Sequence, residues 1–301
     1  MPNSRWVEVN RGSQWHRLDQ FSPQTVMRTL QLSTGQQIPI LGLGTWQMGE
    51  TAKHRTDEIK ALRRGLDLGI VLIDTAEMYG EGGAEQVIAE AIAGRRSEVF
   101  LVSKVYPHNA SPQGTIAACE RSLKRLKTDY LDSYLLHWRG SIPLAETLEA
   151  FEALQQAGKI RSYGVSNFDV DDMREAIQHG QAIATNQVLY NLMRRGIEWD
   201  LLPWCRERNI PIMAYSPVEQ GRLLRDPKLQ NLAKQRGVSA AQLAIAWLLH
   251  QDNVIVIPKS SRIEHVEQNR AALDLKLSAD ELATIEAAFP PPTKPVPLEM
   301  L

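Results

Sequence analysis

Three polar side chains stand where apolar runs of the sequence end. Asp74 follows the run 70–73, and Tyr79 lies five residues beyond it. Lys104 and His137 end two later apolar runs. In a barrel of parallel strands, residues at the carboxyl ends of the strands meet on one catalytic face. The face would then contain a carboxylate, a phenol, an ammonium and an imidazole. This combination of groups predicts a proton-donating site.

The chemistry of such a site depends on the environment of Tyr79. An unperturbed phenol has a pKa of ~10 and keeps its proton at neutral pH. It becomes a usable general acid when a neighbour lowers that pKa. We expect the ammonium of Lys104 to do so, with Asp74 fixing the lysine and keeping it charged. A neutral imidazole at His137 would orient a carbonyl oxygen or share its proton.

Each of these residues also has a purely structural interpretation. Asp74 could cap a turn, Tyr79 could be an aromatic side chain at a rim, and Lys104 could be a solvated loop end. A histidine after an apolar strand, as at His137, is more often a buried core residue with its hydrogen bonds made than a catalytic residue. The coincidence of these residue types at three successive strand ends favours the catalytic interpretation.

The surrounding sequence alternates between short β-rich runs and helical patterns. The runs that we expect to be strands are 41–45, 70–73, 99–103, 130–136, 160–165, 184–188, 211–215 and 254–257. Helical patterns follow at 57–68, 82–92, 112–126, 144–156, 170–179, 199–208, 229–235, 240–249 and 262–271. Eight such units over ~250 residues predict an α/β fold, a (β/α)8 TIM barrel with a parallel sheet.

The ends of the chain divide it into three parts. Residues 28–40 predict a short N-terminal β-hairpin that caps the bottom of the barrel. We expect the barrel itself over 28–290 and a proline-rich C-terminal tail over 291–301. Residues 1–27 predict an N-terminal extension that could be partly ordered.

Two helices near the end of the barrel have recognisable start signals. Ser239 with Gln242, and Ser278 with Glu281, have the form of capping boxes. The second of them predicts a last helix before the tail.

A doubly wound open sheet is the alternative architecture. The glycines of the segment 42–49 superficially resemble the phosphate-binding turn of that fold. The third glycine of this segment does not lie at the position that the phosphate-binding turn requires, and no helix follows the segment immediately. This mismatch favours the barrel.

Composition excludes several classes of function. The net charge of −1 provides no field that would recruit nucleic acid or an anionic membrane. No apolar run reaches the length of about 18 residues that a membrane span needs, and the N-terminal residues lack the apolar core of a secretory signal. Cys119 and Cys205 have neither metal-site nor disulfide spacing, so we expect structural thiols, no metal and a cytoplasmic protein.

Six short motifs occur in order along the chain. They are Gly42-Leu-Gly-Thr-Trp46, Asp74-Thr-Ala-Glu-Met-Tyr79-Gly, Leu101-Val-Ser-Lys104, Leu135-Leu-His137-Trp, Gly164-Val-Ser-Asn167-Phe and Ile257-Pro-Lys259-Ser. In this order they resemble the aldo-keto reductase superfamily over roughly residues 28–290, and some segments resemble its bacterial methylglyoxal reductases. The resemblance implies a (β/α)8 barrel that binds a nicotinamide cofactor across its C-terminal face.

The resemblance also implies roles for individual residues. The superfamily's catalytic tetrad falls on Asp74, Tyr79, Lys104 and His137, with Tyr79 as the proton donor to an aldehyde or ketone oxygen. Cofactor contacts are implied for Ser166, Asn167, Gln187, Tyr215, Ser216, Val218, Lys259, Ser260, Arg262, His265, Gln268 and Asn269. Trp46 and Trp138 would line the substrate pocket.

Two departures from the superfamily pattern bear on specificity. His265 stands where an arginine often binds the 2′-phosphate of NADPH, and Arg262 would compensate. We therefore expect NADPH (NADP+) as the cofactor and leave NADH use open. The segment 139–143 and the tail are short, which predicts a shallow, open pocket for small carbonyl compounds. We expect a monomer or a weak homodimer.

Two other functions are compatible with parts of this sequence. Some members of the superfamily are redox-sensing modules that hold the cofactor with little turnover. An unrelated aldolase barrel could use Lys104 as a Schiff-base lysine, which needs a lowered pKa. A paired Asp74 would raise that pKa instead, which argues against the aldolase.

Overall fold

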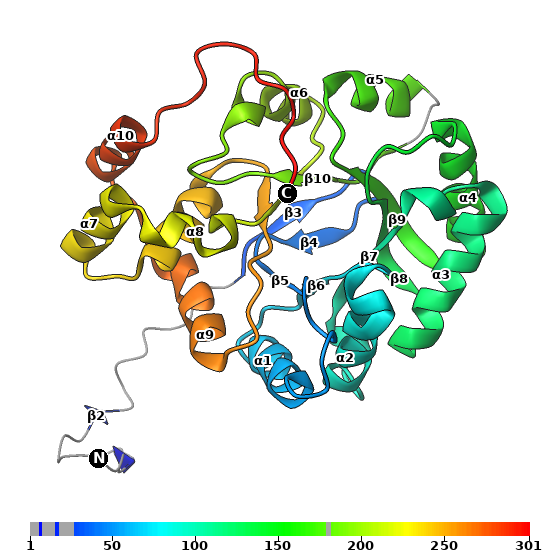
Figure 1. Ribbon diagram of the computed structural model, residues 1–301, viewed down its shortest axis with the longest axis horizontal. Coiled ribbons are helices and arrows are strands. Elements are labelled where there is room, and N and C mark those ends of the chain that lie inside the picture. The colour runs from blue at the N-terminus through cyan, green and yellow to red at the C-terminus, as the bar shows by residue number, and fades with distance from the viewer. Residues whose placement is uncertain (1–5, 8–15, 18–26, 179–181) are drawn as a thin grey trace.

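The computed structural model describes residues 6–7, 16–17, 27–178 and 182–301. Eight parallel strands form its central sheet, in the order in which they occur along the chain (Figure 1). They are β5 (Gly42–Gly44), β6 (Leu72–Asp74), β7 (Phe100–Val105), β8 (Leu131–Leu136), β9 (Ile160–Ser166), β10 (Asn186–Leu189), β11 (Ile212–Tyr215) and β12 (Val254–Val256). This order confirms the predicted barrel and excludes the doubly wound sheet, whose strand order reverses.

Backbone hydrogen bonds join the last strand to the first. The amide of Val256 donates to the carbonyl oxygen of Ile40 at 2.8 Å, and that of Gly44 donates to the oxygen of Pro258 at 3.0 Å. Gly44 also forms a parallel bridge with Lys259. The sheet therefore closes on itself, and the residues that follow β12 are held beside those that follow β5.

Helices surround the sheet in the pattern that the sequence predicts. They are α1 (Arg55–Asp67), α2 (Gly83–Ala91), α3 (Pro112–Leu126), α4 (Leu144–Gln156), α5 (Val170–Gln178), α6 (Leu201–Glu207), α7 (Pro227–Arg236), α8 (Ala240–His250), α9 (Ile263–Ala271) and α10 (Ala279–Ala288). Short 3-10 helices span Tyr79–Gly82, Arg96–Glu98, Pro107–Asn109, Gly196–Glu198, Glu219–Gly221, Leu223–Arg225 and Ala272–Asp274. Both predicted capping boxes are present at the starts of α8 and α10.

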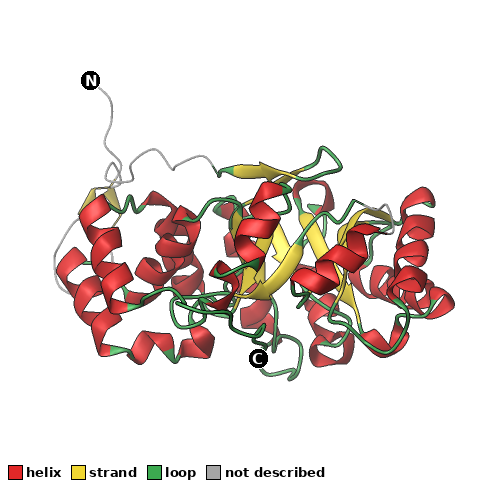
Figure 2. Cartoon of the chain, turned by 90° about the horizontal axis from the view of Figure 1, so that it is seen from above, coloured by secondary structure: helices red, strands yellow, loops and turns green. Residues whose placement is uncertain are grey.

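An antiparallel hairpin of β3 (Thr29–Gln31) and β4 (Gln37–Pro39) covers one end of the barrel. Its Leu32 and Ile38 are buried in one cluster with Leu72 and Phe100, which lie at the starts of β6 and β7. Figure 2 shows the hairpin and the C-terminus at opposite ends of the barrel. The hairpin therefore closes the N-terminal end and leaves the carboxyl ends of the strands open, as predicted.

Strand alternation decides which side chains enter the barrel. Successive residues of a strand point to opposite faces. Leu72 belongs to the interior cluster and Ile73 to the layer under the helices, so Asp74 points inward. In β7, Val102 is interior and Val105 lies under the helices, which places Lys104 inside as well.

The observed bounds differ from the predicted ones in a few places. The third strand extends to Val105, so Lys104 lies within the strand and not beyond it. The second strand begins at Leu72, two residues later than predicted. The predicted end of the fifth helix, 179–180, lies outside the described residues, as do 1–5, 8–15 and 18–26 of the predicted extension. Within that extension, β1 (Trp6–Val7) pairs with β2 (His16–Arg17).

Candidate active site

A chain of polar contacts connects three of the predicted tetrad residues. The ammonium of Lys104 lies 2.9 Å from Asp74 Oδ2 and 3.3 Å from the hydroxyl of Tyr79. It also donates to the carbonyl oxygen of Thr75 at 2.8 Å. The side chain of Lys104 is fully buried, and that of Asp74 is 3% exposed. The lysine is therefore a fixed cation placed against the phenol.

The loop after β6 places the phenol above that cation. Tyr79 opens a 3-10 helix in which Gly80 has a φ of 55°, a left-handed conformation that glycine adopts readily. A Cβ atom on Gly80 would lie 2.9 Å from the carbonyl oxygen of Met48. Glycine therefore lets this loop pack tightly against the loop after β5.

The pKa of Tyr79 departs from the sequence expectation. Burial raises the pKa of its hydroxyl above the ordinary value, and the nearby Lys104 opposes this increase without overcoming it. Burial lowers the pKa of Lys104, but the charges and hydrogen bonds of Asp74 and Tyr79 together outweigh burial, so the pKa is raised. Lys104 is thus a permanent cation and Tyr79 a protonated phenol at neutral pH, and a raised lysine pKa is the opposite of what a Schiff-base aldolase needs.

His137 completes the group from the end of β8. Its ring centroid lies 5.7 Å from that of Tyr79, in an edge-on arrangement. Burial and the charge of Lys104 lower the pKa of His137 to about 2. Among the described residues its buried Nδ1 has no hydrogen-bond partner. The imidazole is therefore neutral at physiological pH and can donate one hydrogen bond without carrying charge.

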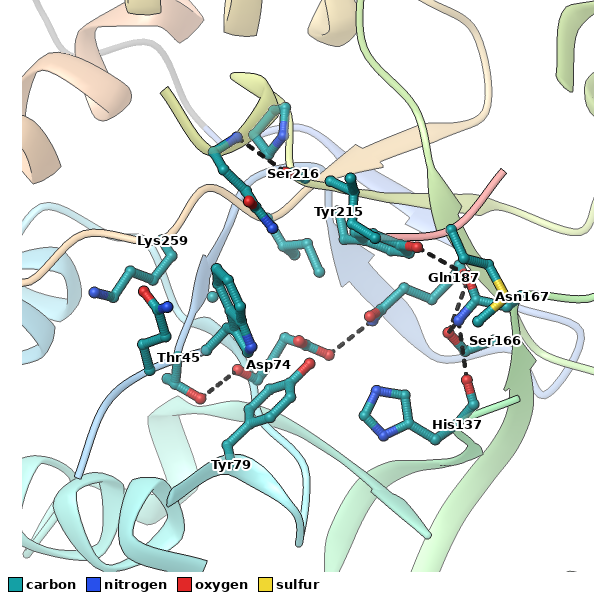
Figure 3. A pocket seen from close by; sticks show the side chains of 18 of the residues that line it. Thr45, Asp74, Tyr79, His137, Ser166, Asn167, Gln187, Tyr215, Ser216 and Lys259 are labelled. Carbon is teal, nitrogen blue, oxygen red and sulfur yellow. Dashed lines mark hydrogen bonds between the residues drawn. The ribbon is translucent and has the colours of Figure 1, made fainter. Parts of the chain in front are cut away.

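Polar side chains from β9, β10 and β11 line the opposite wall (Figure 3). The amide of Gln187 donates to Asp74 Oδ1 at 2.8 Å, and Ser166 Oγ donates to the Gln187 carbonyl oxygen. Asn167 donates to the carbonyl oxygen of His137 at 3.1 Å and accepts from the Tyr215 hydroxyl at 3.0 Å. The amides expected to hold the cofactor thus also fix Asp74 and His137.

The segments after β11 and β12 are candidates for binding an anionic group. Ser216 and Val218 line the cavity, and Ser216 begins a loop with a positive φ. Lys259 forms no ion pair or side-chain hydrogen bond within the part of the chain that the structure describes, and partial burial lowers its pKa. Its ammonium belongs to the segment before α9, whose N-terminal amides favour an anion. An anionic group could bind there without displacing a protein partner.

The structure brings together most, but not all, of the predicted residues. The cavity has a volume of about 590 Å3. Its lining includes the predicted residues Trp46, Asp74, Tyr79, His137, Trp138, Ser166, Asn167, Gln187, Tyr215, Ser216, Val218 and Lys259. Lys104 lies beneath it, in contact with Tyr79. The other predicted residues, which do not line it, lie just before or on α9: Ser260, Arg262, His265, Gln268 and Asn269.

The tail contributes a wall that the sequence did not predict. Met300 and Leu301 line the cavity, as do Trp46 and Met78. Figure 1 shows the tail running from α10 back to the mouth of the barrel. The expected shallow, open pocket is therefore wrong on this side, because the path of an extended tail depends on distant contacts. Thr45, which donates to the carbonyl oxygen of Asp74 at 2.9 Å, was also missed.

The described residues contain neither a candidate metal site nor a candidate membrane span. No group of three or more histidine, cysteine or acidic side chains that could hold a metal ion occurs there. None of the helices formed by the described residues is both long and apolar enough to cross a membrane.

Comparison with known proteins gives consistent matches. Residues 40–289 match the aldo/keto reductase family. Methylglyoxal reductase YeaE of Escherichia coli is 51% identical over 91% of this chain and 99% of its own, and glyoxal reductase of Bacillus subtilis is 35% identical over 88% and 94%. A crystal structure of an aldo/keto reductase from Klebsiella pneumoniae in complex with NADP and acetate matches with a TM-score of 0.89 and 51% identity, covering 92% of this chain and 100% of that one.

Proposed function

Since the chain belongs to the aldo/keto reductase family, we propose that it is an NADPH-dependent reductase of small aldehydes and ketones. The observation that carries the proposal is the buried contact series from Asp74 through Lys104 to Tyr79 at the floor of the cavity. Methylglyoxal-like dicarbonyls and aromatic aldehydes are the proposed substrates, because the relative at 51% identity is a methylglyoxal reductase. The apolar walls at Trp46 and Trp138 suit compounds of this size.

The cavity has the groups that a nicotinamide cofactor needs. Lys259 is a cation without an ion-pair partner among the described residues, placed before the N-terminus of α9. Ser166, Asn167 and Gln187 would hold the carboxamide, and Tyr215 would lie against the nicotinamide ring. Two neighbours in structure, both from Klebsiella pneumoniae, are complexes with NADP and NADPH.

The remaining cofactor contacts complete this proposal. The cavity-lining Ser216 and Val218 would reach the pyrophosphate, and Lys259 with Ser260 would bind the adenosine end. Around the start of α9 and along it, the residues proposed for that end are Arg262, His265, Gln268 and Asn269. When bound, NADPH supplies the hydride for the carbonyl carbon.

Tyr79 is the proposed proton donor. Its raised pKa keeps the phenol protonated until the carbonyl oxygen becomes a more basic alkoxide. The ammonium of Lys104, 3.3 Å away, stabilises the phenolate that remains after the transfer. Asp74 holds this lysine in place and charged. Neutral His137 orients the carbonyl oxygen by a hydrogen bond that does not depend on pH.

The experiment compares Tyr79→Phe with Tyr163→Phe, a buried tyrosine that is absent from the cavity lining. NADPH consumption is followed with methylglyoxal, glyoxal and an aromatic aldehyde, and NADPH binding by fluorescence. We expect Tyr79→Phe to lose about 100-fold or more in kcat and to keep its affinity for NADPH. Tyr163→Phe should keep its turnover.

Three outcomes would overturn parts of the proposal. Turnover that survives Tyr79→Phe would remove this residue as the proton donor. NADPH binding without turnover on all of the carbonyls would favour a redox-sensing module over a reductase. A preference for NADH over NADPH would contradict the phosphate site at Lys259.

A further inference from the structure

A buried carboxylate fixes the loop that follows β11. Glu219 is fully buried in that loop, and its Oε1 accepts from Arg194 at 2.9 Å and from Arg222 at 2.7 Å. Its Oε2 accepts from the amide of Asn191 at 2.8 Å. A buried carboxylate with several charge-assisted bonds holds a defined position. Ser216 is tied to the same group, because Asn191 also donates to its carbonyl oxygen at 2.9 Å.

This loop, residues 216–222, has a strained backbone. Ser216, Glu219 and Gln220 all have φ values between 51° and 52°, a region that residues with side chains seldom adopt. Such a conformation persists only where its surroundings enforce it. Asn191 and Arg194, from the segment after β10, provide that enforcement through side-chain contacts.

The same arginine extends to the tail. Nη1 of Arg194 lies 2.5 Å from Oε1 of Glu299, while its Nε bonds Glu219. Glu299 directly precedes Met300 and Leu301, the two tail residues that line the cavity. The guanidinium of Arg194 therefore links the loop 216–222 to the tail, and both segments contribute residues to the cavity lining. Its planar fork keeps the two carboxylates in a fixed relation.

We propose that Arg194 is a positioning residue that couples cofactor binding at the loop 216–222 to the placement of Met300 and Leu301 against the substrate. The inference rests on the proposed function, because it takes Ser216 and Val218 as cofactor contacts. A cofactor that fixes this loop fixes Glu219, and through Arg194 it fixes Glu299. Coupling between two binding sites is reciprocal, so a carbonyl-site ligand strengthens cofactor binding by the same factor.

Three variants distinguish the contact of Arg194 with Glu219 from its contact with Glu299. Arg194→Met removes both contacts, and Glu299→Gln weakens only the contact to the tail. Arg222→Met is the matched control, because it also removes an arginine from Glu219 but no described contact joins Arg222 to the tail. Folding is checked by thermal unfolding, and Glu299→Gln, at a half-buried surface position, keeps the test valid if Arg194→Met is unstable.

The first readout is backbone hydrogen exchange of the full chain with and without NADP+. We expect NADP+ to slow exchange in both 216–222 and 296–301 of the unaltered protein. In Arg194→Met and Glu299→Gln, protection should persist at 216–222 and be lost from the tail. Arg222→Met should retain protection of the tail.

The second readout compares the effect of each variant on KM for the carbonyl with its effect on kcat. Arg194→Met and Glu299→Gln should both raise KM for the carbonyl by about 5-fold or more, with a much smaller change in kcat. Tail protection that survives both of these variants, or that Arg222→Met also abolishes, would overturn the proposal. A protein that shows no NADP+ binding at all would instead refute the proposed function, so the two failures are distinguishable.

Discussion

Replacing Lys104 with methionine tests whether the floor of the cavity depends on a buried ion pair. Both partners are buried, and the lysine also donates to the Thr75 carbonyl oxygen. Without the ammonium, Gln187, at 2.8 Å, is the one side-chain donor that the described residues leave to the Asp74 carboxylate. Removing one partner of a buried ion pair typically costs about 3–5 kcal/mol in the free energy of unfolding. We expect a loss in that range for Lys104→Met.

The double variant Lys104→Met with Asp74→Asn supplies the control. It removes both charges, and an asparagine can still accept from Gln187. Replacing both members of a buried pair by neutral groups is often close to neutral in stability. We therefore expect the double variant to be more stable than Lys104→Met alone, and within about 1–2 kcal/mol of the unaltered protein.

The assay is urea unfolding followed by tryptophan fluorescence, with the free energy obtained by linear extrapolation. A loss below about 1 kcal/mol in Lys104→Met would refute the reasoning, because surface ion pairs contribute amounts of that size. A double variant less stable than the single one would refute it as well. Either result would mean that the Asp74 carboxylate is stabilised by groups other than Lys104.

The pKa values of Tyr79, His137 and the two cysteines lead to three further predictions. Carbonyl reduction needs Tyr79 protonated and its pKa is raised, so kcat should stay level to about pH 9 and fall only above about pH 10. The pKa of His137, about 2, predicts no acid limb near 6.5, and such a limb that disappeared in His137→Asn would contradict it. Burial raises the pKa of Cys119 and Cys205 to about 12, so a disulfide reagent near pH 8 should label neither thiol in the folded protein and both in denaturant. Rapid labelling of the folded protein would show that the helices open readily.

Local sequence patterns were sufficient for the barrel and for the floor of its cavity. Asp74 follows the continuous apolar run 70–73 and Lys104 ends the run that begins at Val99, and the alternation of side chains along a strand turns both residues inward. The pKa of Tyr79 needed the structure, because burial competes there with the charge of Lys104 and the balance depends on three-dimensional packing. The sign of that shift was therefore not readable from residue types.

The tail and the loop after β11 could not be predicted for a related reason. Pro290 and the prolines after it indicate an extended segment, but nothing in its composition says where such a segment runs. Its course depends on pairs such as Arg194 with Glu299, which lie far apart in the sequence. The burial of Glu219 likewise depends on Asn191, which belongs to a different strand–helix unit.

Closure of the sheet has a consequence for how the chain folds. Neighbouring strands up to β11 pair over short sequence distances, whereas the bonds from Val256 to Ile40 and from Gly44 to Pro258 join the two extremes of the barrel sequence. Contacts of such long range carry the largest loop-closure entropy and form slowly. Because Lys259 is bridged to Gly44, we expect it to take its place only when the sheet closes. We therefore expect a refolding chain to assemble the Asp74–Lys104 pair before it gains affinity for a phosphate group.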